Sequence, residues 1–494
     1  MKKAIAILVV LTIALCFSGC GDKKKDKKTA DKTSSVKKSE GQAETMELSL
    51  KYDDFYELEG AKSVKSSNTD VIKAAKGNLH AVGISESPVD VTVTGEDGKE
   101  TVYKVTVSKA KINIAIVAGQ SNASGETSGV PETAAKYTSA VCKQGTAYIW
   151  GANSIPSALG GAGSYDGFRS AYAAEWYEQS LKAGDPQKTV VVFANNYTAT
   201  PGEKVDEWLS GNTEKGSLKK TADMLNACYD YYESGKGSAF FEISGCGMYW
   251  LQGESDRRDT FSYYYGKFNT LWSQFKSATK NRVKYCAFMR VRASYESDSG
   301  LELGGPVLAQ YKLANDFDDI YMATTLTETL TGSLKTPATV DVSNYNIFGE
   351  SQYSQIVSEN TLSEMQGNIY GGLHYSRLGY NIIGADAAYN MYRALHASKD
   401  TATLVNENGE RVASVAFGET ASVSADKLAS NLYVYKDSGS SGNKVSLKVI
   451  SGGADITSTA YNSGTCFISG GAVKTSGTQI ILSDGSKSAT FKIS

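Results

Sequence analysis

Histidine is scarce in this chain of 494 residues: only His80, His374 and His396 occur, and no H-E-x-x-H pattern is present. Catalytic zinc sites are usually built on histidine, so this scarcity excludes such a metal centre, although it does not exclude an all-oxygen calcium site. The seven cysteines include no C-x-x-C pair, which speaks against a zinc or redox motif. We therefore expect a protein that uses neither a metal nor an organic cofactor.

An excess of positive charge is also missing. The net charge is −2, and residues 1–40 hold ten Lys against four acids, so this segment carries +6 and the rest of the chain −8. Nucleic-acid binding relies on Lys and Arg that neutralise phosphates, so a mildly acidic body indicates no nucleic-acid partner. Hydrophobic residues at 41% and charged residues at 21% are ordinary for a folded globular protein.

The start of the chain has the pattern of an export signal followed by a tether. Lys2 and Lys3 precede an apolar run, 4–17, which is too short to span a membrane and ends in Phe-Ser-Gly-Cys20. This ending resembles the bacterial lipobox, where cleavage before a cysteine is followed by its lipidation; an uncleaved anchor helix is the alternative. We predict a lipoprotein signal peptide over 1–20 with lipidation at Cys20, and a disordered Lys/Ser/Thr-rich tether over 21–44. Both alternatives place the protein on the extracellular face of a cell membrane.

Two regions show the short alternating runs that are typical of β structure. In residues 45–109, the runs 89–93 and 102–107 flank an Asp-Gly turn, which predicts a hairpin. This region resembles the bacterial Ig-like (group 2) domains, which are small β-sandwiches. Residues 399–494 are predicted to form a second β-sandwich, whose role is glycan binding or spacing. Its expected strands are 432–435, 445–450, 479–482 and 489–494.

Between these regions, residues 110–398 alternate apolar strands with amphipathic helices, a rhythm that predicts an α/β domain with a parallel sheet. In such sheets, ligands bind at the carboxyl ends of the strands. The five expected strands are 112–118, 190–195, 240–251, 283–291 and 320–325, and the expected helices include 170–182, 218–233, 260–276 and 308–316.

Three polar blocks follow elements of this domain. Residues 118–125 place Ser121 on a glycine-containing turn after the first strand, although the chain has no G-x-S-x-G motif. Residues 249–256 place an amide, two carboxylates and a hydroxyl at the end of the third strand. Residues 371–379 place His374 before an amphipathic helix that runs to about 397.

Each block taken alone has a structural interpretation. The first is also compatible with an ordinary strand–helix turn, and in the second Ser255 or Asp256 is a candidate cap for the helix near 260. A single histidine is often structural, as we expect for His80. His396 is expected to cap carbonyls at the end of its helix or to meet solvent.

Together, the three blocks resemble the SGNH-type hydrolases and, within them, the sialate O-acetylesterase-like carbohydrate esterases. The family marks are a G-Q-S-N turn, a Q-G-E-x-[DN] strand end and a late His followed five residues on by Gly. They are matched here by Gly119–Asn122, Gln252–Asp256 and His374 with Gly379, while the family's glycine block is degenerate over Pro201–Trp208. The resemblance implies a three-layer α/β/α domain flanked by the two β-sandwiches.

The resemblance also implies residue roles. Ser121 is the expected nucleophile, and His374 accepts its proton and later activates water. The oxyanion is expected to meet the N–H groups of Ser121 and Gly202 and one side chain, either Gln252 or Ser255. The supporting residues are Gln120, Asn122, Glu254 and Asp256.

One position departs from the family pattern. The Asp usually found three residues before the His is replaced here by Gly371. Loss of the corresponding carboxylate function costs about 10⁴-fold in turnover in the Ser-His-Asp template. Three alternatives stay open: a backbone carbonyl holds His374, an acid such as Asp256, Asp341 or Glu364 replaces the missing Asp, or the site is inactive.

The function that these patterns favour is an extracellular, lipid-anchored carbohydrate O-acetylesterase that acts on acetylated glycans through an acyl-serine intermediate. The alternative is a surface lipoprotein that binds a glycan or another partner with a degenerate, non-catalytic esterase-like core. The sequence identifies neither the sugar nor the oligomeric state.

Overall fold

The computed structural model describes most of the chain from residue 43 to residue 494. The predicted signal peptide, Cys20, Gly371, Asp341 and Glu364 all lie outside the described residues. Within 43–494, the residues not described are 76, 127–141, 161–165, 210–216, 292–293, 298–299, 328–373, 376, 398–399, 408, 410, 429, 437–444 and 463–466.

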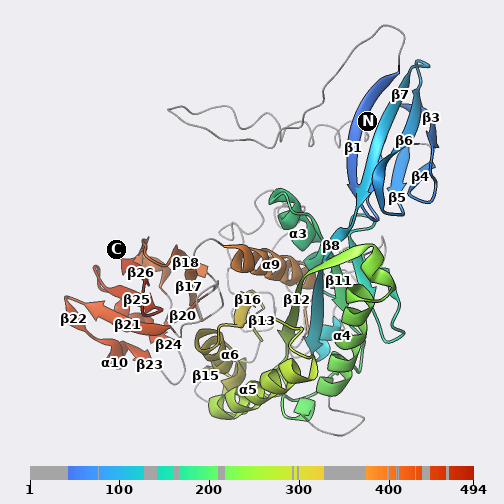
Figure 1. The fold of residues 1–494 in the computed structure, drawn as a ribbon. Helices are drawn as coiled ribbons and strands as arrows, with labels where there is room; N and C mark the ends of the chain where they lie inside the picture. The colour runs from blue at the N-terminus through green and yellow to red at the C-terminus, as the bar shows by residue number, and fades with distance from the viewer. Residues whose placement is uncertain are drawn as a thin grey trace, which may run out of the picture.

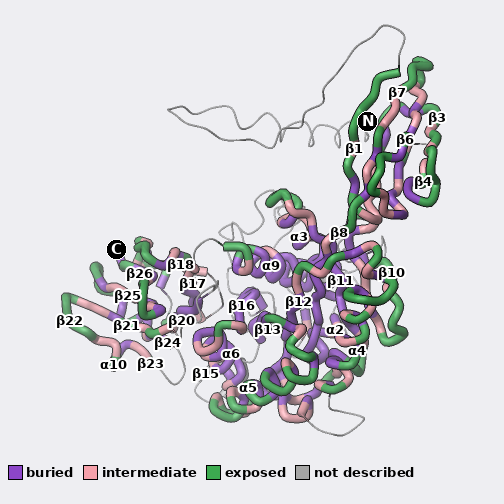
Figure 2. Tube along the Cα trace, viewed as in Figure 1, coloured by how far each residue is buried: buried purple, intermediate pink, exposed green. Residues whose placement is uncertain are grey.

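The N-terminal β-region, residues 43–109, consists of two small sheets around a shared core of aliphatic side chains. The predicted hairpin is present: β6 and β7 pair antiparallel across the Asp97-Gly98 turn. β1 pairs parallel with β7 and is largely exposed, as Figure 2 shows. The strand orders are β1-β7-β6-β3 and β2-β5-β4, with β1 Glu44–Lys51, β2 Phe55–Glu57, β3 Ala61–Ser66, β4 Ile72–Ala75, β5 Asn78–Ala81, β6 Ser85–Gly95 and β7 Glu100–Ser108.

The central region is built on a seven-stranded sheet of order β10-β9-β11-β8-β12-β13-β16. All neighbours pair parallel except β10, which pairs antiparallel with β9 at the edge. The α/β class is therefore confirmed, but the expected count of five strands was wrong. β9 and β10 were missed because a run of three or four residues shows no usable periodicity. The strands are β8 Ala110–Gly119, β9 Ala147–Trp150, β10 Pro156–Ala158, β11 Gln187–Val192, β12 Phe241–Leu251, β13 Tyr285–Met289 and β16 Ile320–Thr324.

Helices cover both faces of this sheet (Figure 1). Side chains of α3 and α9 pack together and against one face, and side chains of α4, α5 and α6 pack against the other. β11, β13 and β16 are consequently buried along their length, as expected for a parallel sheet between helices (Figure 2). The helices are α2 Ser121–Ser124, α3 Arg169–Lys182, α4 Ser217–Glu233, α5 Phe261–Ala278, α6 Gly305–Asp316 and α9 Arg377–His396, and a hairpin of β14 Ser294–Ser297 and β15 Gly300–Leu303 precedes α6.

The C-terminal β-region, from residue 400 onward, has two five-stranded sheets of order β18-β17-β20-β24-β23 and β19-β26-β25-β21-β22, with one apolar core between them. All four strands expected here are present as β20, β21, β25 and β26. The bounds are β17 Thr401–Asn406, β18 Arg411–Ala416, β19 Thr420–Val423, β20 Asn431–Lys436, β21 Ser446–Ser451, β22 Ala454–Asp455, α10 Thr457–Ala460, β23 Tyr461–Asn462, β24 Phe467–Ser469, α11 Gly470–Val473, β25 Gln479–Ser483 and β26 Ser488–Ile493.

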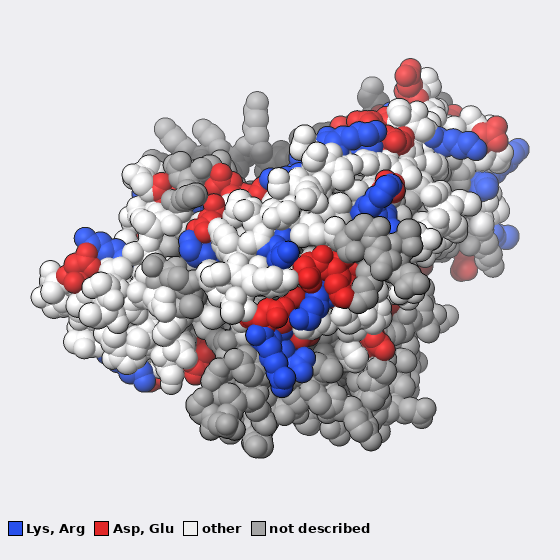
Figure 3. Space-filling view, turned by 90° about the horizontal axis from the view of Figure 1, so that it is seen from below, with Lys and Arg blue, Asp and Glu red and all other residues white. Residues whose placement is uncertain are grey.

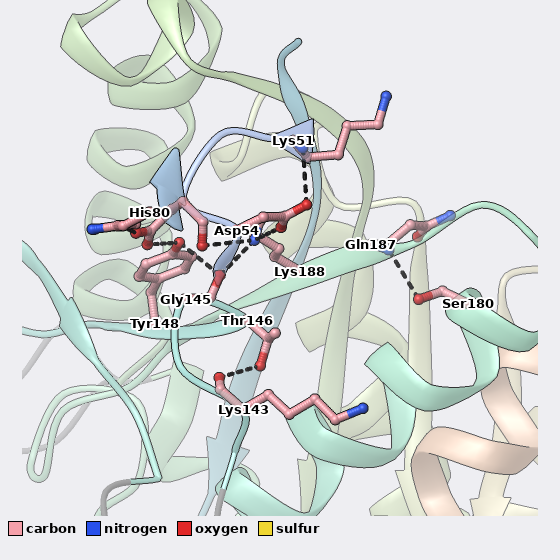
Figure 4. Close-up of polar contacts among 11 residues, drawn as sticks. Lys51, Asp54, His80, Lys143, Gly145, Thr146, Tyr148, Ser180, Gln187 and Lys188 are labelled. Carbon is pink, nitrogen blue, oxygen red and sulfur yellow. Dashed lines mark hydrogen bonds and ion pairs between the residues drawn. The ribbon is translucent and has the colours of Figure 1, made fainter. Parts of the chain in front are cut away.

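The N-terminal β-region is joined to the central region by buried polar contacts (Figure 4). Lys188 of β11 is only 2% exposed, and its ammonium group donates to Asp54 Oδ1 at 2.8 Å, Gly145 O at 2.7 Å and Asp53 O at 3.3 Å. The carboxylate of Asp53 accepts from Tyr148 and contacts His80 Nε2 at 2.6 Å. The three ammonium hydrogens thus each have an acceptor, and His80 has the structural role that was expected for it.

The C-terminal β-region is joined to the central region by stacked aromatic rings instead. Tyr311 of α6 lies parallel to Tyr433 of β20, with ring centroids 4.6 Å apart and an interplanar angle of 4°. Asn315 donates to Val434 O at 2.9 Å and accepts from Lys436 N at 3.2 Å. The side-chain amide of Asn315 therefore extends the hydrogen-bond pattern of the β20 strand into the central region.

The surface charge, the hydropathy of the helices and the state of the cysteines complete the description. On the face shown in Figure 3, acidic and basic side chains lie next to one another rather than in separate fields. In the described part of the chain, no helix is both long enough and apolar enough to cross a membrane. Cys142, Cys228, Cys246 and Cys286 are free thiols and are buried.

Candidate functional site

Ser121 begins the short helix α2 directly after the central strand β8. Gly119, the last residue of β8, has φ +148°, and a Cβ built there would lie 1.9 Å from Leu251 O of the neighbouring strand. Only glycine therefore permits this close approach of β8 and β12 at their carboxyl ends. The helix ends at Gly125, also at positive φ, where a Cβ would meet Gly167. The sequence thus forces a sharp turn that places Ser121 at the edge of the sheet.

Gln120 connects this turn to the polar block at the end of β12. Its backbone N–H donates to Leu251 O at 3.1 Å. Its side-chain oxygen accepts from the N–H groups of Gly253 at 3.2 Å and Ser255 at 3.3 Å. The first two sequence blocks are therefore joined by hydrogen bonds through one buried amide. The two residues that flank Glu254 are held directly to the turn that bears Ser121, residues 119–125, which we call the nucleophile turn after the role expected for Ser121.

A second connection runs through Asn122. Its amide nitrogen donates to Glu254 Oε1 at 2.5 Å, and its amide oxygen accepts from the hydroxyl of Tyr380 at 2.7 Å. Tyr380 lies on α9, the helix that follows His374, and its hydroxyl also lies 2.9 Å from Glu126 O. Asn122 therefore links all three sequence blocks, because it bonds to the end of β12 and to the helix of the third block.

Gln252 is fully buried, and its amide group is engaged by the protein. Its nitrogen lies 3.0 Å from Glu203 O, 2.5 Å from Asp256 Oδ2 and 3.4 Å from Gln120 Oε1. Its oxygen accepts from Tyr264 at 3.0 Å. Since both amide hydrogens have protein acceptors, Gln252 acts as a structural bridge, and we do not retain it as an oxyanion donor. Ser255, half-buried at the rim, is the remaining side-chain candidate.

Asp256 lies inside the protein rather than capping a helix. Its two oxygens accept from Val205 N at 3.3 Å, while the cap of α5 is Thr260, whose side chain accepts from Tyr263 N. The interpretation of Ser255 or Asp256 as the helix cap was therefore wrong. Burial raises the pKa of Asp256 to about 7, and the nearby carboxylate of Asp259 adds to this effect. Because Asp256 is buried and bonds to the side-chain amide of Gln252, it holds that amide in place.

The segment expected to hold Gly202 is placed beside the nucleophile turn by backbone pairing. Gly119 N donates to Thr198 O at 3.0 Å, and Thr200 N donates to Gly119 O at 3.2 Å. Gly202 follows in an exposed turn with φ +75°. Farther along, Trp208 is fully buried and meets Trp250 edge to face at 4.7 Å. The degenerate glycine block thus still anchors its loop through its tryptophan.

His374 is mostly buried, with 16% of its side chain exposed, and its Nε2 lies 4.0 Å from Glu126 Oε2. The next residue, Tyr375, is fully buried and packs edge to face on Tyr380. Three acids were considered from the sequence as replacements for the missing Asp. Asp256 bonds to Gln252 and Val205 N, and Asp341 and Glu364 lie outside the described residues. His396 contacts Tyr392 O in the last turn of α9, as expected.

Three residues at the site were missed by sequence reasoning. Glu126 and Tyr380 are described above. Arg169, at the start of α3, donates to Ala123 O at 3.3 Å and Ser124 O at 3.2 Å, and its guanidinium lies 3.8 Å from the ring centroid of Phe193. It thereby holds the end of α2 in place. No motif could have revealed these residues, because each acts through a contact that is distant in sequence.

In the described ranges, no three His, Cys, Asp or Glu side chains gather to hold a metal ion. The arrangement instead offers a serine on a tight turn, a histidine near a carboxylate, and backbone N–H groups on two adjoining loops. Such a set can carry out acyl transfer.

No family model and no curated protein matches the chain. Solved structures with partial similarity include a protein from Arabidopsis thaliana, with 14% identity and a TM-score of 0.34 over 57% of this chain and 97% of that one. A carbohydrate acetylesterase from Xanthomonas citri has 13% identity and a TM-score of 0.24, over 49% of this chain and 57% of that one.

A 2,6-sialyltransferase from a Photobacterium species has 9% identity and a TM-score of 0.20, over 52% of this chain and 55% of that one. The alignments thus span little more than half the length of both carbohydrate-active proteins. At TM-scores of 0.34 and below, none of these similarities carries an argument about the activity of this chain. The function must therefore be argued from the site itself.

Proposed function

We propose that the protein is a carbohydrate O-acetylesterase whose nucleophile is Ser121. The observation that carries this proposal is the convergence of three distant sequence blocks at the carboxyl edge of one sheet. The turn of Ser121 is bonded to residues 253–255 through Gln120 and to the helix after His374 through Asn122 and Tyr380. A purely structural turn does not require such an arrangement.

In the proposed mechanism, the oxygen of Ser121 attacks the acetyl carbonyl while His374 takes its proton. The N–H groups of Ser121 and Gly202, with Ser255 at the rim, stabilise the oxyanion. The proton passes to the departing sugar oxygen, and an acyl-serine remains. His374 then removes a proton from water, which attacks the acyl group, and returns that proton to the departing oxygen of Ser121 as acetate is released. No step needs a cofactor.

The expected place of action is the extracellular face of a bacterial membrane, with the chain lipid-anchored at Cys20. This part of the proposal is supported by the sequence of residues 1–20 alone. It predicts that the mature protein partitions into detergent and that Cys20→Ser releases it into the aqueous phase.

The test of the proposed activity is acetate release by the purified protein from a panel of acetylated glycans, with p-nitrophenyl acetate as a general probe. Ser121→Ala and His374→Ala are expected to lower kcat by at least about 10³-fold while thermal unfolding stays nearly unchanged. Activity that survives Ser121→Ala at the wild-type level would refute the proposal.

A second candidate is a non-catalytic glycan-binding protein, and the presence of Gly371 in place of the family's Asp favours it. It predicts saturable binding of glycans by the folded protein with no acetate released. The same glycan panel therefore separates the two functions.

A further inference from the structure

The carboxylate that faces His374 in the structure comes from an unexpected part of the chain. Glu126 Oε2 lies 4.0 Å from His374 Nε2, whereas position 371, where the family pattern has its Asp, holds glycine. Glu126 follows the nucleophile by five positions and lies just beyond the end of α2. The acid and the nucleophile are therefore contributed by the same loop.

The backbone of Glu126 is fixed on both sides by the site. Its N–H donates to Ser121 O at 3.1 Å, an oxygen that also accepts from Ser124 Oγ at 2.8 Å. Its carbonyl oxygen lies 2.9 Å from the hydroxyl of Tyr380, which also lies 2.7 Å from Asn122 Oδ1, so the one hydroxyl hydrogen is shared between two acceptors. The position of Glu126 is thus set by the nucleophile turn on one side and by the helix after His374 on the other.

We propose that Glu126 is the positioning residue of His374 and supplies the carboxylate that Gly371 lacks, an inference that rests on the proposed esterase function. A carboxylate beside an imidazole holds one tautomer and stabilises the imidazolium that forms when the nucleophile loses its proton. A separation of 4.0 Å is an ion-pair distance rather than a hydrogen bond. Catalytic hydrogen bonds are often long in a free enzyme and tighten when the substrate binds.

Under this proposal, the two ring nitrogens of His374 have different roles. Nε2 is the nitrogen that lies 4.0 Å from Glu126, so it carries the ring hydrogen, which points to the carboxylate. The proton of Ser121 then goes to Nδ1 as the serine oxygen bonds to the acyl carbon, and Nδ1 passes it to the departing alkoxide. The roles of the two nitrogens are reversed relative to the Ser-His-Asp template, in which the carboxylate holds Nδ1.

The kinetic test compares Glu126→Gln, Glu126→Asp and Glu242→Gln in the full-length protein with p-nitrophenyl acetate as substrate. Glu126→Gln keeps the shape and removes the charge, so kcat is expected to fall about 10²-fold with KM within about threefold. Glu126→Asp restores the charge and is expected to recover at least about tenfold of that loss. Glu242 is an exposed carboxylate at the opposite end of β12, and its variant is expected to match wild type.

A spectroscopic measurement tests the same contact without using activity. The ¹⁵N shifts of His374, assigned by comparison with His374→Gln, are expected to report the Nε2–H tautomer in wild type and a mixture of tautomers in Glu126→Gln. A kcat within twofold of wild type for Glu126→Gln, together with an inactive Ser121→Ala, overturns the role of Glu126 and leaves the esterase standing. If wild type releases no acetate, the esterase fails, and the ¹⁵N shifts still decide whether Glu126 holds His374.

Discussion

The nucleophile side and the histidine side of the candidate site are held by different kinds of contact. On the nucleophile side, the buried amides Gln120 and Gln252 bond to backbone groups just after β12 and to the backbone of Glu203. On the histidine side, the contacts include the approach of His374 to Glu126 and the hydroxyl of Tyr380. The first side is thus tied to the sheet, and the second depends on side chains from α9 and from the loop after α2.

This difference indicates where the site gains its rigidity. Parallel strands fix their carboxyl ends relative to one another, so short side chains can connect them with good geometry. A histidine that precedes a helix has no such frame, and its position depends on contacts between side chains. We therefore expect substitutions of the buried amides Gln120 and Gln252 to affect folding and activity together, and substitutions of His374 and Glu126 to affect mainly activity.

The largest effect is expected for Gln252→Leu. This change keeps the volume but removes the buried amide that bonds to Asp256 and Glu203 O, while Tyr264 keeps the backbone carbonyl of residue 252. With about 1–3 kcal/mol for each of the two affected groups, the free energy of unfolding should fall by about 2–6 kcal/mol, and activity should be lost. Urea unfolding measures this change. Gln479→Leu, at a half-buried amide in the C-terminal β-region, is the control and should change stability by less than about 1 kcal/mol. Equal losses of stability in Gln252→Leu and Gln479→Leu would show that the amide of Gln252 has no special role in holding the site together.

The next effect concerns pH. Asp256 has its pKa raised from 3.8 to about 7 in the folded state, chiefly by burial. The folded state therefore binds this proton more tightly than the unfolded state, and stability falls as the pH rises from about 4 to about 7. At about 1.4 kcal/mol per pKa unit, the loss amounts to at most about 4 kcal/mol.

Asp256→Asn should remove this part of the pH dependence, because an amide cannot ionise. Urea unfolding at several pH values between 5 and 8 measures the change. Glu175→Gln is the matched control, since burial also raises the pKa of Glu175 to about 7, but on α3 and outside the site. Both variants should flatten the stability curve, and only Asp256→Asn should lower kcat. A pH dependence unchanged by Asp256→Asn would show that Asp256 stays ionised in the fold.

The smallest effect is expected for Tyr380→Phe, which removes the hydroxyl that bonds to Asn122 and Glu126. Stability should fall by about 1–2 kcal/mol, and kcat should fall about tenfold because Asn122 and Glu126 lose the hydroxyl that they share. Tyr389→Phe makes the same change at a half-buried hydroxyl on the same helix and should leave kcat unchanged. A loss of stability well above about 2 kcal/mol in Tyr380→Phe, with kcat unchanged, would contradict the comparison of the two sides.

Most of the secondary structure could be predicted from the sequence, because long strands and amphipathic helices have clear periodicities. The strand expected over 190–195 is an instructive error: β11 ends at Val192, and the residues after it turn to pair with Gly119. A continuous apolar run shows where a strand lies but not where it stops, because Phe193, the residue just beyond the end of β11, is also apolar and buried.

The candidate site was predicted where its chemistry is local in the sequence. Ser121 on its turn and the polar block 252–256 after β12 were identified from residue types and spacing. The bond between Tyr380 and Glu126 joins residues 254 positions apart. Neither residue belongs to a motif, so no pattern in the sequence could have shown that contact.

The sequence by itself determined that the central region is α/β, that Gly119 and Gly125 flank a turn bearing Ser121, and that the residue three positions before His374 is Gly371. These properties follow from local preferences and residue identity. The tertiary structure decided that Gln252 is a buried bridge, that Asp256 lies beneath it, and that Glu126 faces His374. Those facts depend on which side chains the packed sheet and helices bring together, and packing is a property of the whole chain.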